Sequence, residues 1–433
     1  MTPLRVLHVT PYFADAWAYG GIPRVAAALT SGLVNRGHDV TVCSTDACSA
    51  SNRLANPEGD NRFRPWSPTR TESGVVVRVF PNVSNRLAYQ QLFTPLGLGD
   101  YLQRSASTFD VAHLHACRNL PGVIAAHHLR RARVPYVLAP NGTAPRIERR
   151  RFAKRAFDVL IGASVLRHAT RVLAVSSAER EQLCSLGVAA PAIRLVPNPL
   201  EMQEFQTPPV RGRFRGRLGV TGPIVLFLGR ITPRKRLDVL VRAFAKYVSG
   251  PAEAVTRGAE AAGRPAACPE PRRGEAGRYV QSTLVIAGND AGSAGAARRL
   301  AHALGIGDRT VFTGLLTGPE RLEALADADV VVYPSQHEIF GLVPLEALMV
   351  GTPVIVADDS GCAEVVQSVG GGLIAPAGDV GAFAVAIAGV IGGLPSWRDR
   401  AVEAAAQVDS LYSSRVVCAA LEGVYQEVVD AAA

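Results

Sequence analysis

The chain has 433 residues, which is too long for one ordinary hydrophobic core and suits two domains. Hydrophobic residues make up 48% of it and charged residues 19%, which excludes a disordered or fibrous protein. The formal net charge of +9 favours anionic partners such as nucleotides, nucleic acid or acidic lipid, although an arginine-rich proteome would produce the same excess.

The cysteines are dispersed, and no two of them stand at C-x-x-C spacing. This arrangement indicates reduced thiols in a cytosolic protein and no zinc site. The N-terminal apolar run is too short for a signal peptide, and the longest apolar stretch, Val380 to Leu394, is shorter than a membrane span. We therefore expect a cytoplasmic protein that is at most peripheral at the inner face of the cytoplasmic membrane.

Short apolar runs alternate with helical patterns in the first half of the chain. The runs predict strands within residues 4–10, 38–46, 75–80, 110–115, 135–141 and 171–176. Strands separated by helices form right-handed crossovers, so these strands predict a parallel sheet. We expect a first α/β domain over residues 1–205.

A Pro/Gly/Arg-rich stretch at 197–222 is typical of a linker, and a second alternating series follows it. The second series predicts strands within residues 224–230, 282–290, 310–316, 330–335, 353–359 and 372–378. These form a second α/β domain over 206–405, interrupted by a Gly/Pro/Ala/Arg-rich insertion at 249–279. The region 406–433 is expected to form a C-terminal helix, whose apolar face comprises Val417, Leu421, Val424, Tyr425 and Val428.

Two glutamates stand around an expected helix start in SQHEIFGLVPLEALMVGTPVI, residues 335–355. Glu338 precedes the helix, which should begin near Gly341, and Glu346 lies inside it. Free backbone N–H groups in the first turn of such a helix form an anion site that fits a diphosphate. The carboxylates could then accept hydroxyl hydrogen bonds, Glu338 from a sugar and Glu346 from a ribose. Taken alone, the stretch favours the alternative, in which Glu346 is a solvated helix residue and Glu338 a loop acid.

Other motifs support the diphosphate interpretation. Gly229 ends a predicted strand, and Arg230 and Lys235 follow it before the next helix, where two cations could neutralise a diphosphate. In the first domain, Gly20 and Gly21 separate the first strand from its helix, so the backbone can approach a phosphate or sugar there. Their spacing is not G-x-G-x-x-G, which removes the main support for a dinucleotide oxidoreductase.

Together these stretches resemble glycosyltransferase family 4, the retaining glycosyltransferases of GT-B fold. The motifs GRITPRK, LVIAGND and HEIFGLVPLEALMVGTPVIVAD carry the likeness, and YGGIPRV is similar to the N-terminal glycine loop of that family. The resemblance runs from Val6 to about Gly378, except for the insertion. It implies two Rossmann-like, doubly wound parallel-sheet domains that face a cleft, and a C-terminal helix that packs back on the first domain.

The resemblance also implies roles for individual residues. Arg230 and Lys235 would bind the donor diphosphate and stabilise the leaving nucleoside diphosphate, and Glu338 would contact the transferred sugar near its reacting face. Further donor-binding groups are expected at Glu346, which would hold the ribose, at Phe340, Gly341 and Leu342, and at Gly229, Gly20 and Gly21. The family generally needs no metal, so we expect no metal and no other cofactor, with the nucleotide-sugar as a substrate.

The chain departs from the family pattern at one position. Many members carry a histidine where this chain has Asn141, in LAPNGTAP, residues 138–145. Asn141 can donate or accept a hydrogen bond, but it cannot act as a base. His115, at the end of a neighbouring predicted strand, is a second candidate for the cleft, and a satisfied core or rim histidine is an equal alternative.

The sequence therefore predicts a retaining hexosyl- or related glycosyltransferase of class EC 2.4, as in polysaccharide biosynthesis. Its donor would be a nucleotide-diphosphate-sugar, with UDP- or GDP-sugars expected first, and its acceptor a glycan, a lipid-linked molecule or a small molecule. A non-catalytic nucleotide-sugar sensor, supported by Asn141, and a GT-B-like nucleotide-sugar epimerase are the alternatives. Nucleic acid is not expected as a partner, because no recognition helix or aromatic-interleaved basic strand stands out.

One basic stretch bears on the acceptor. Residues 146–155, RIERRRFAKR, hold six basic residues and one acid and precede an apolar run. Such a segment could rest on an anionic membrane and meet a lipid-linked acceptor there. A solvated, arginine-rich helix face is the alternative.

Overall fold

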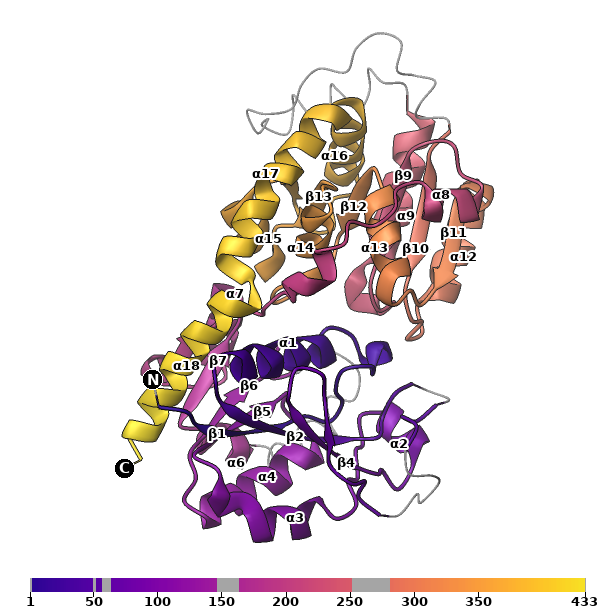
Figure 1. Ribbon diagram of the computed structural model, residues 1–433. Coiled ribbons are helices and arrows are strands. Elements are labelled where there is room, and N and C mark those ends of the chain that lie inside the picture. The colour runs from indigo at the N-terminus through magenta and orange to yellow at the C-terminus, as the bar shows by residue number, and fades with distance from the viewer. Residues whose placement is uncertain (1, 50–51, 57–63, 146–162, 251–280, 433) are drawn as a thin grey trace. The chain divides into compact units, whose positions relative to one another are not determined.

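The structure is a computed structural model that describes residues 2–49, 52–56, 64–145, 163–250 and 281–432. The basic stretch 146–155 and nearly all of the insertion 249–279 lie outside the described residues. The chain divides into two compact units: unit 1 is Met1–Glu201 with Tyr412–Ala433, and unit 2 is Met202–Leu411 (Figure 1). The sequence placed this boundary between 205 and 206 and the start of the returning segment at 406.

Unit 1 is built on a sheet whose eight strands, within the described residues, have the order β3-β4-β2-β1-β5-β6-β7-β8. These strands are β1 (Arg5–Val9), β2 (Asp39–Thr45), β3 (Thr69–Arg70), β4 (Val76–Phe80), β5 (Val111–His115), β6 (Tyr136–Ala139), β7 (Arg171–Ala174) and β8 (Ile193–Leu195). Every neighbouring pair is parallel except β3 with β4. The strands β3 and β8 were not predicted, because two or three residues carry no readable period.

Helices cover both faces of this sheet. Figure 1 shows α1 on one face and α3 and α4 on the other. The helices of unit 1 are α1 (Ile22–Asn35), α2 (Asn85–Tyr89), α3 (Leu98–Ser105), α4 (Leu120–Arg131), α6 (Ala163–Arg167), α7 (Ser177–Ser185) and α18 (Ser414–Asp430). Because both faces are covered, every residue of β5 and β6 is buried, as their continuous apolar runs indicated.

The C-terminal helix α18 belongs to unit 1, where it packs against α1, β5 and β6. The face predicted from its apolar spacing, from Val417 to Val428, is buried. Gly32 of α1 permits the close approach of the two helices, because a Cβ there would lie 2.5 Å from the sulfur of Cys418. Beside this contact, the buried Glu422 pairs with Arg36 and lies 3.2 Å from the His38 ring nitrogen.

Unit 2 contains a second parallel sheet, whose six described strands have the order β11-β10-β9-β12-β13-β14. These strands are β9 (Ile224–Leu228), β10 (Thr283–Ala287), β11 (Thr310–Gly314), β12 (Val330–Tyr333), β13 (Val354–Ala357) and β14 (Gly372–Ala375). Each of them lies within an apolar run that predicted a strand. The two observed sheets confirm the predicted fold class of two doubly wound α/β domains.

The helices of unit 2 include one that was not predicted from the sequence. They are α8 (Arg213–Leu218), α9 (Leu237–Ser249), α12 (Ala294–Ala303), α13 (Gly318–Asp327), α14 (Leu342–Met349), α15 (Gly361–Val369), α16 (Val380–Gly392) and α17 (Leu394–Tyr412). The short α8 lies inside the stretch 197–222, where the sequence predicted a linker and no helix. This helix is stabilised against α13 by buried Phe214 and by Asp327, which accepts hydrogen bonds from the N–H groups of Gly212 and Arg215.

No single described helix is both long enough and apolar enough to cross a membrane. The consecutive helices α16 and α17 pass the length and composition test only as a pair, bent by 94°.

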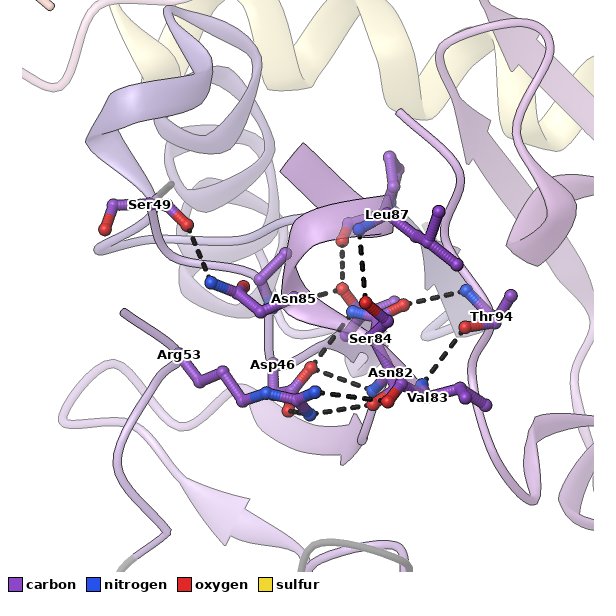
Figure 2. A network of polar contacts seen from close by, with 12 residues as sticks. Asp46, Ser49, Arg53, Asn82, Val83, Ser84, Asn85, Leu87 and Thr94 are labelled. Atoms are coloured by element: carbon purple, nitrogen blue, oxygen red, sulfur yellow. Dashed lines mark hydrogen bonds and ion pairs between the residues drawn. The ribbon is translucent and has the colours of Figure 1, made fainter. Parts of the chain in front are cut away.

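A polar network stabilises the loops that follow β2 and β4 in unit 1 (Figure 2). The buried carboxylate of Asp46 accepts hydrogen bonds from the backbone and side chain of Asn82, at 2.9 and 3.0 Å, and from Arg53 at 2.7 Å. Thr94 binds back to Asn82 and to the N–H of Val83. These bonds satisfy polar groups that would otherwise be buried without partners, so the carboxyl edge of this sheet carries ordered loops.

Replacement of Glu422 tests the attachment of α18. Glu422→Ala removes a buried carboxylate and leaves Arg36 and His38 without their partner, so we expect the free energy of unfolding of unit 1 to fall by about 1–3 kcal/mol. Urea unfolding followed by circular dichroism measures this. Asp430→Ala, at an exposed position of the same helix, is the matched control and should have a much smaller effect. Equal stabilities of the Glu422 variant and the control would contradict this account of the anchor.

Candidate functional site

The sheet of unit 2 reverses its strand order between β9 and β12. The chain runs outward from β9 through β10 to β11, then returns to β12 and continues through β13 to β14. The loops after β9 and β12 therefore leave in opposite directions at the carboxyl ends of these strands, which is where ligands bind in such sheets. The residues selected from the sequence follow these two strands: Gly229, Arg230 and Lys235 after β9, and Glu338, Phe340, Gly341 and Leu342 after β12.

The structure joins Lys235 to Glu338. The Nζ atom of Lys235 lies 2.5 Å from a carboxylate oxygen of Glu338 and also donates to the Tyr333 hydroxyl at the end of β12. The N–H of Gln336 donates to the carbonyl of Arg234 at 2.9 Å, which holds the two loops together. A cation from one loop and an anion from the other therefore meet at the point where the strand order reverses.

The surroundings keep this group in a defined charge state. Burial by itself would raise the pKa of Glu338, but the charges of Lys235 and Arg234 outweigh it and hold that pKa below its usual value. Burial, with the charge of Glu338 added, raises the pKa of Tyr333 well above its ordinary value. At neutral pH Glu338 is thus a carboxylate and Tyr333 a neutral phenol that can donate to it.

The helix α14 begins at Leu342, as the sequence indicated, with Gly341 as its N-cap. Gly341 has a left-handed backbone (φ 80°), and a Cβ there would lie 2.1 Å from the sulfur of Cys362. The N–H of Gly361 donates to the carbonyl of Glu338 at 2.6 Å and joins this loop to the start of α15. Glycine is required at position 341 on two counts, and the first-turn N–H groups of α14 carry no side-chain cap.

Glu346 lies on α14 with none of its surface exposed, whereas the side chain of Glu338 is 14% exposed. Its carboxylate forms an ion pair with Arg321 of α13, which also pairs with Glu204. The sequence assigned Glu346 to a ribose, and that role stays a prediction. It requires a ribose hydroxyl to reach this carboxylate beside the Arg321 guanidinium.

Gly229 and Arg230 stand at the end of β9. Gly229 has φ 150°, and its carbonyl lies 1.8 Å from where a Cβ on Gly288 would be, so two glycines let the β9 and β10 loops touch. The Nε atom of Arg230 is buried and has no hydrogen-bond partner among the described residues. Its guanidinium therefore retains donor capacity for an anion at this edge of the sheet.

In unit 1, the strand order reverses between β1 and β5, and the other predicted residues lie near these strands. Gly20 has φ 100° and open space where a Cβ would be, whereas Gly21 is the ordinary right-handed N-cap of α1. Asn141 follows β6 with φ 49°, and both polar atoms of its side chain are buried without a partner among the described residues. His115 ends β5 with none of its surface exposed.

His115 is part of a buried chain of hydrogen bonds. Its Nε2 lies 2.9 Å from His8 Nδ1, His8 Nε2 lies 3.3 Å from the Tyr425 hydroxyl, and this hydroxyl lies 2.7 Å from His113 Nδ1. Burial lowers the pKa of His115 to about 3 and lowers those of His8 and His113 well below their usual value. All three rings are therefore neutral at pH 7, so His115 does not supply a positive charge.

The same three histidines are the residues with metal-ligand spacing in the described part of the chain, with ligand atoms within 4.8 Å of one another. The rings of His113 and His115 stack with an interplanar angle of 6° and centroids 4.2 Å apart. Imidazole binds a metal along a lone pair in the ring plane, so two parallel stacked rings cannot direct their lone pairs at one ion. This packing suits an internal hydrogen-bond chain.

Sequence reasoning missed three residues of these sites. Tyr333 was read only as part of an apolar strand, although a phenol at a strand end before a loop is a usable signal. Arg321 and Glu179 carry no motif, because their partners are distant in sequence. Glu179 in α7 is wholly buried and accepts from the N–H of Gly142 at 2.6 Å, directly beside Asn141.

The geometry at Gly341 predicts a steric cost. Gly341→Ala places a methyl group against Cys362 and in a left-handed backbone, so we expect the free energy of unfolding of unit 2 to fall by about 1–3 kcal/mol. Gly314→Ala, also in unit 2, is the matched control, because it adds a side chain at φ 79° in open space. Combining Gly341→Ala with Cys362→Ala should recover part of the loss in denaturant unfolding. A double variant no more stable than the single one would contradict the contact.

The neutral histidines predict acid sensitivity of unit 1. The pKa of His115 is about 3 in the folded chain and near 6.5 when unfolded, so its contribution is present above pH 6.5 and is lost as the pH falls from there towards 3. The loss is about 1.4 kcal/mol per pH unit for one histidine. His115→Gln should flatten the dependence of urea stability on pH between 7 and 5, and the exposed control His127→Gln should leave it unchanged. Equal slopes would refute this.

Two family models match most of the chain. Residues 20–199 match the family described as a glycosyl transferase 4-like domain, and residues 222–392 match glycosyl transferases group 1. A D-inositol 3-phosphate glycosyltransferase of Acidothermus cellulolyticus is 28% identical over 410 residues, covering 89% of this chain and 82% of that protein. One of Saccharomonospora viridis is 32% identical over 278 residues, covering 63% of this chain and little more than half, 56%, of that protein.

Solved structures show the same fold. HepE of Anabaena, in complex with UDP and glucose, has a TM-score of 0.68 at 17% identity, covering 98% of this chain and all of that one. Sucrose-phosphate synthase of Thermosynechococcus elongatus has a TM-score of 0.70 at 19% identity, covering 99% of this chain and all of that one. Since the two matched domains follow one another along the chain and each unit carries its own parallel sheet, the chain belongs to glycosyltransferase family 4 and has the GT-B fold.

Proposed function

We propose that the protein is a retaining glycosyltransferase that transfers a sugar from a nucleotide-diphosphate-sugar. The observation that carries this is the meeting of Lys235 and Glu338 at the point where the strand order of unit 2 reverses. A diphosphate needs cations and N–H donors, and a sugar needs a carboxylate acceptor within the same few ångströms. The matched family supports the transferase, and HepE, solved with UDP-glucose, supports a UDP-sugar as the first donor to test.

Lys235 can bind the donor without giving up its present partners. An ammonium has three N–H donors. Tyr333 and Glu338 take two of them, which leaves one for a phosphate oxygen. Arg230 and the first turn of α14 supply further donors from the two loops. Glu338, held ionised by Lys235, accepts from a hydroxyl of the transferred sugar.

The reaction then needs no base from the protein. The bond between the anomeric carbon and the diphosphate oxygen breaks, its electron pair stays on the diphosphate, and positive charge develops on the sugar ring. The acceptor oxygen approaches from the face that the diphosphate leaves, and its proton passes to a phosphate oxygen. Lys235 and Arg230 stabilise the charge on the departing diphosphate. No step of this scheme calls for a metal, and Asn141 in place of the usual histidine is compatible with turnover.

Donor binding is the first test. A thermal-shift panel of UDP-, GDP-, ADP- and dTDP-sugars should yield at least one hit, since a ligand at a hundred times its Kd stabilises by about 2.7 kcal/mol. The hit is then incubated with glycan and lipid extracts and with D-inositol 3-phosphate, the compound in the names of several relatives. If the enzyme is retaining, the transferred sugar has the same anomeric configuration in the product as in the donor, which NMR measures. Absence of any hit would refute the donor site.

Lys235→Ala is the decisive variant for the site. Loss of one charge-stabilising donor should weaken transition-state stabilisation by about 2–4 kcal/mol, and kcat should fall accordingly. Lys246→Ala, on α9 and outside the two loops, is the matched control and should keep normal turnover. Near-native turnover of the Lys235 variant would overturn its assignment.

A nucleotide-sugar sensor is the second candidate, and the residue that favours it is Asn141. A sensor would show donor binding in the same panel and no turnover with any acceptor. A cytoplasmic location and contact of residues 146–155 with anionic membrane are part of the proposal from the sequence alone. Binding to vesicles that contain anionic lipid tests the membrane contact. Binding that is unchanged by added salt and by reversal of the arginine charges at 149–151 would refute that contact.

A further inference from the structure

Glu179 is a buried acid with no role in the assignments above. It stands in the first turn of α7, three positions after the N-cap Ser176, whose hydroxyl accepts from the Glu179 N–H at 3.2 Å. A glutamate at this position commonly returns to the backbone N–H of the N-cap residue. Here its oxygens instead accept from the N–H of Gly142 at 2.6 Å and from the N–H of Val175 at 3.0 Å.

The turn that Glu179 holds is strained and ordered. Asn141 and Gly142 have consecutive left-handed backbones, with φ 49° and 74°. The neighbouring Thr143 carbonyl accepts from Arg118 at 2.5 Å, and the Thr143 hydroxyl accepts from the N–H of Cys117 at 2.6 Å. A non-glycine residue in this conformation costs free energy and persists only where its surroundings impose it.

The amide of Asn141 is the group that this turn presents. Its oxygen and nitrogen are both buried and make no hydrogen bond to any described residue. A buried amide without partners costs about 1–3 kcal/mol, so a site that keeps one reserves it for a ligand or a bound water. Asn141 stands two residues after the end of β6, at the carboxyl edge of the sheet, where parallel sheets bind ligands.

We propose that Glu179 is a positioning residue, which holds the Asn141–Gly142 turn so that the Asn141 amide meets the substrate in the transfer reaction. This rests on the proposed function for the reaction itself, but the contact between Glu179 and Gly142 stands without it. Glu179 touches no substrate in this scheme and acts through the Gly142 N–H.

The charge on Glu179 should change the turn. Burial raises its pKa to about 7, against the opposing effect of its two N–H bonds. The charged groups on the neighbouring elements point elsewhere: Arg118 binds carbonyls of the loop, and Arg180 and Glu181 are exposed on α7. The ionised carboxylate offers an acceptor to each N–H. The acid form replaces one acceptor by a hydroxyl that must donate, so the turn should relax as the pH falls below 7.

The first measurement reads the turn itself. Asn141–Gly142 is the only Asn-Gly pair in the sequence, so labelling with [13C′]Asn and [15N]Gly gives a single correlated amide signal, that of Gly142. In the wild-type protein this signal should shift with pH with a midpoint near 7. In Glu179→Gln it should not titrate, whereas Glu181→Gln, which removes an exposed acid from the same helix, should behave as the wild type. A Gly142 signal that does not move between pH 5.5 and 8.5 overturns the proposal.

The second measurement reads the reaction, using hydrolysis of UDP-glucose or of the donor that the panel identifies. The wild-type kcat should rise with pH through the same midpoint. In Glu179→Gln the amide oxygen can accept from one backbone N–H, but the amide NH2 group faces the other N–H. The kcat of this variant should not rise with pH and should be about tenfold lower than that of the wild type above pH 7. A variant that is only less heat-stable and keeps the wild-type pH profile would show a structural role and overturn the positioning role. Failure of every donor to bind would instead overturn the proposed function, while the NMR titration still decides whether Glu179 controls the turn.

Discussion

The reversal of strand order in a parallel sheet is the constraint on which these sites depend. Where the chain changes direction between β9 and β12, the following loops must leave on opposite faces, and the carboxyl ends of two adjacent strands are left uncovered. In unit 2 the resulting space is spanned by the ion pair of Lys235 and Glu338 and by the backbone bond from Gln336 to Arg234. In unit 1 the reversal lies between β1 and β5, where His8 and His115 are hydrogen-bonded.

A buried chain of hydrogen bonds joins the sheet of unit 1 to the C-terminal helix. The chain His115–His8–Tyr425–His113 can be satisfied in two ways, because each neutral imidazole donates once and the phenol donates once. In either arrangement the outer nitrogens, His115 Nδ1 and His113 Nε2, are left unused, one as a donor and the other as an acceptor. Tyr425 comes from α18, so the C-terminal helix completes a network that begins on β1. This explains how a helix separated by the whole of unit 2 is held in unit 1.

The sequence predicted most of the sheet architecture because its signals are local. Apolar runs such as those of β5 and β10 mark strands buried on both faces, and the glycine and proline around Leu342 mark the start of α14. The selection of Lys235 and Glu338 was also local, since each stands in a motif at a strand end. The helix α8 was not predicted, because its six residues lie among arginines and glycines. Its stability comes from Asp327, which is far along the chain.

What the sequence by itself determined is therefore the order of the elements, the family and the residues that stand at strand ends. Only the tertiary structure decided which charges meet. Glu338 stands in the loop after β12 and pairs with Lys235, while Glu346, eight positions later, is wholly buried against Arg321. Glu179 and Gly142 meet across 37 residues. A sequence pattern records neighbours along the chain, whereas the partner and the burial of a charged group depend on which segments the fold brings together.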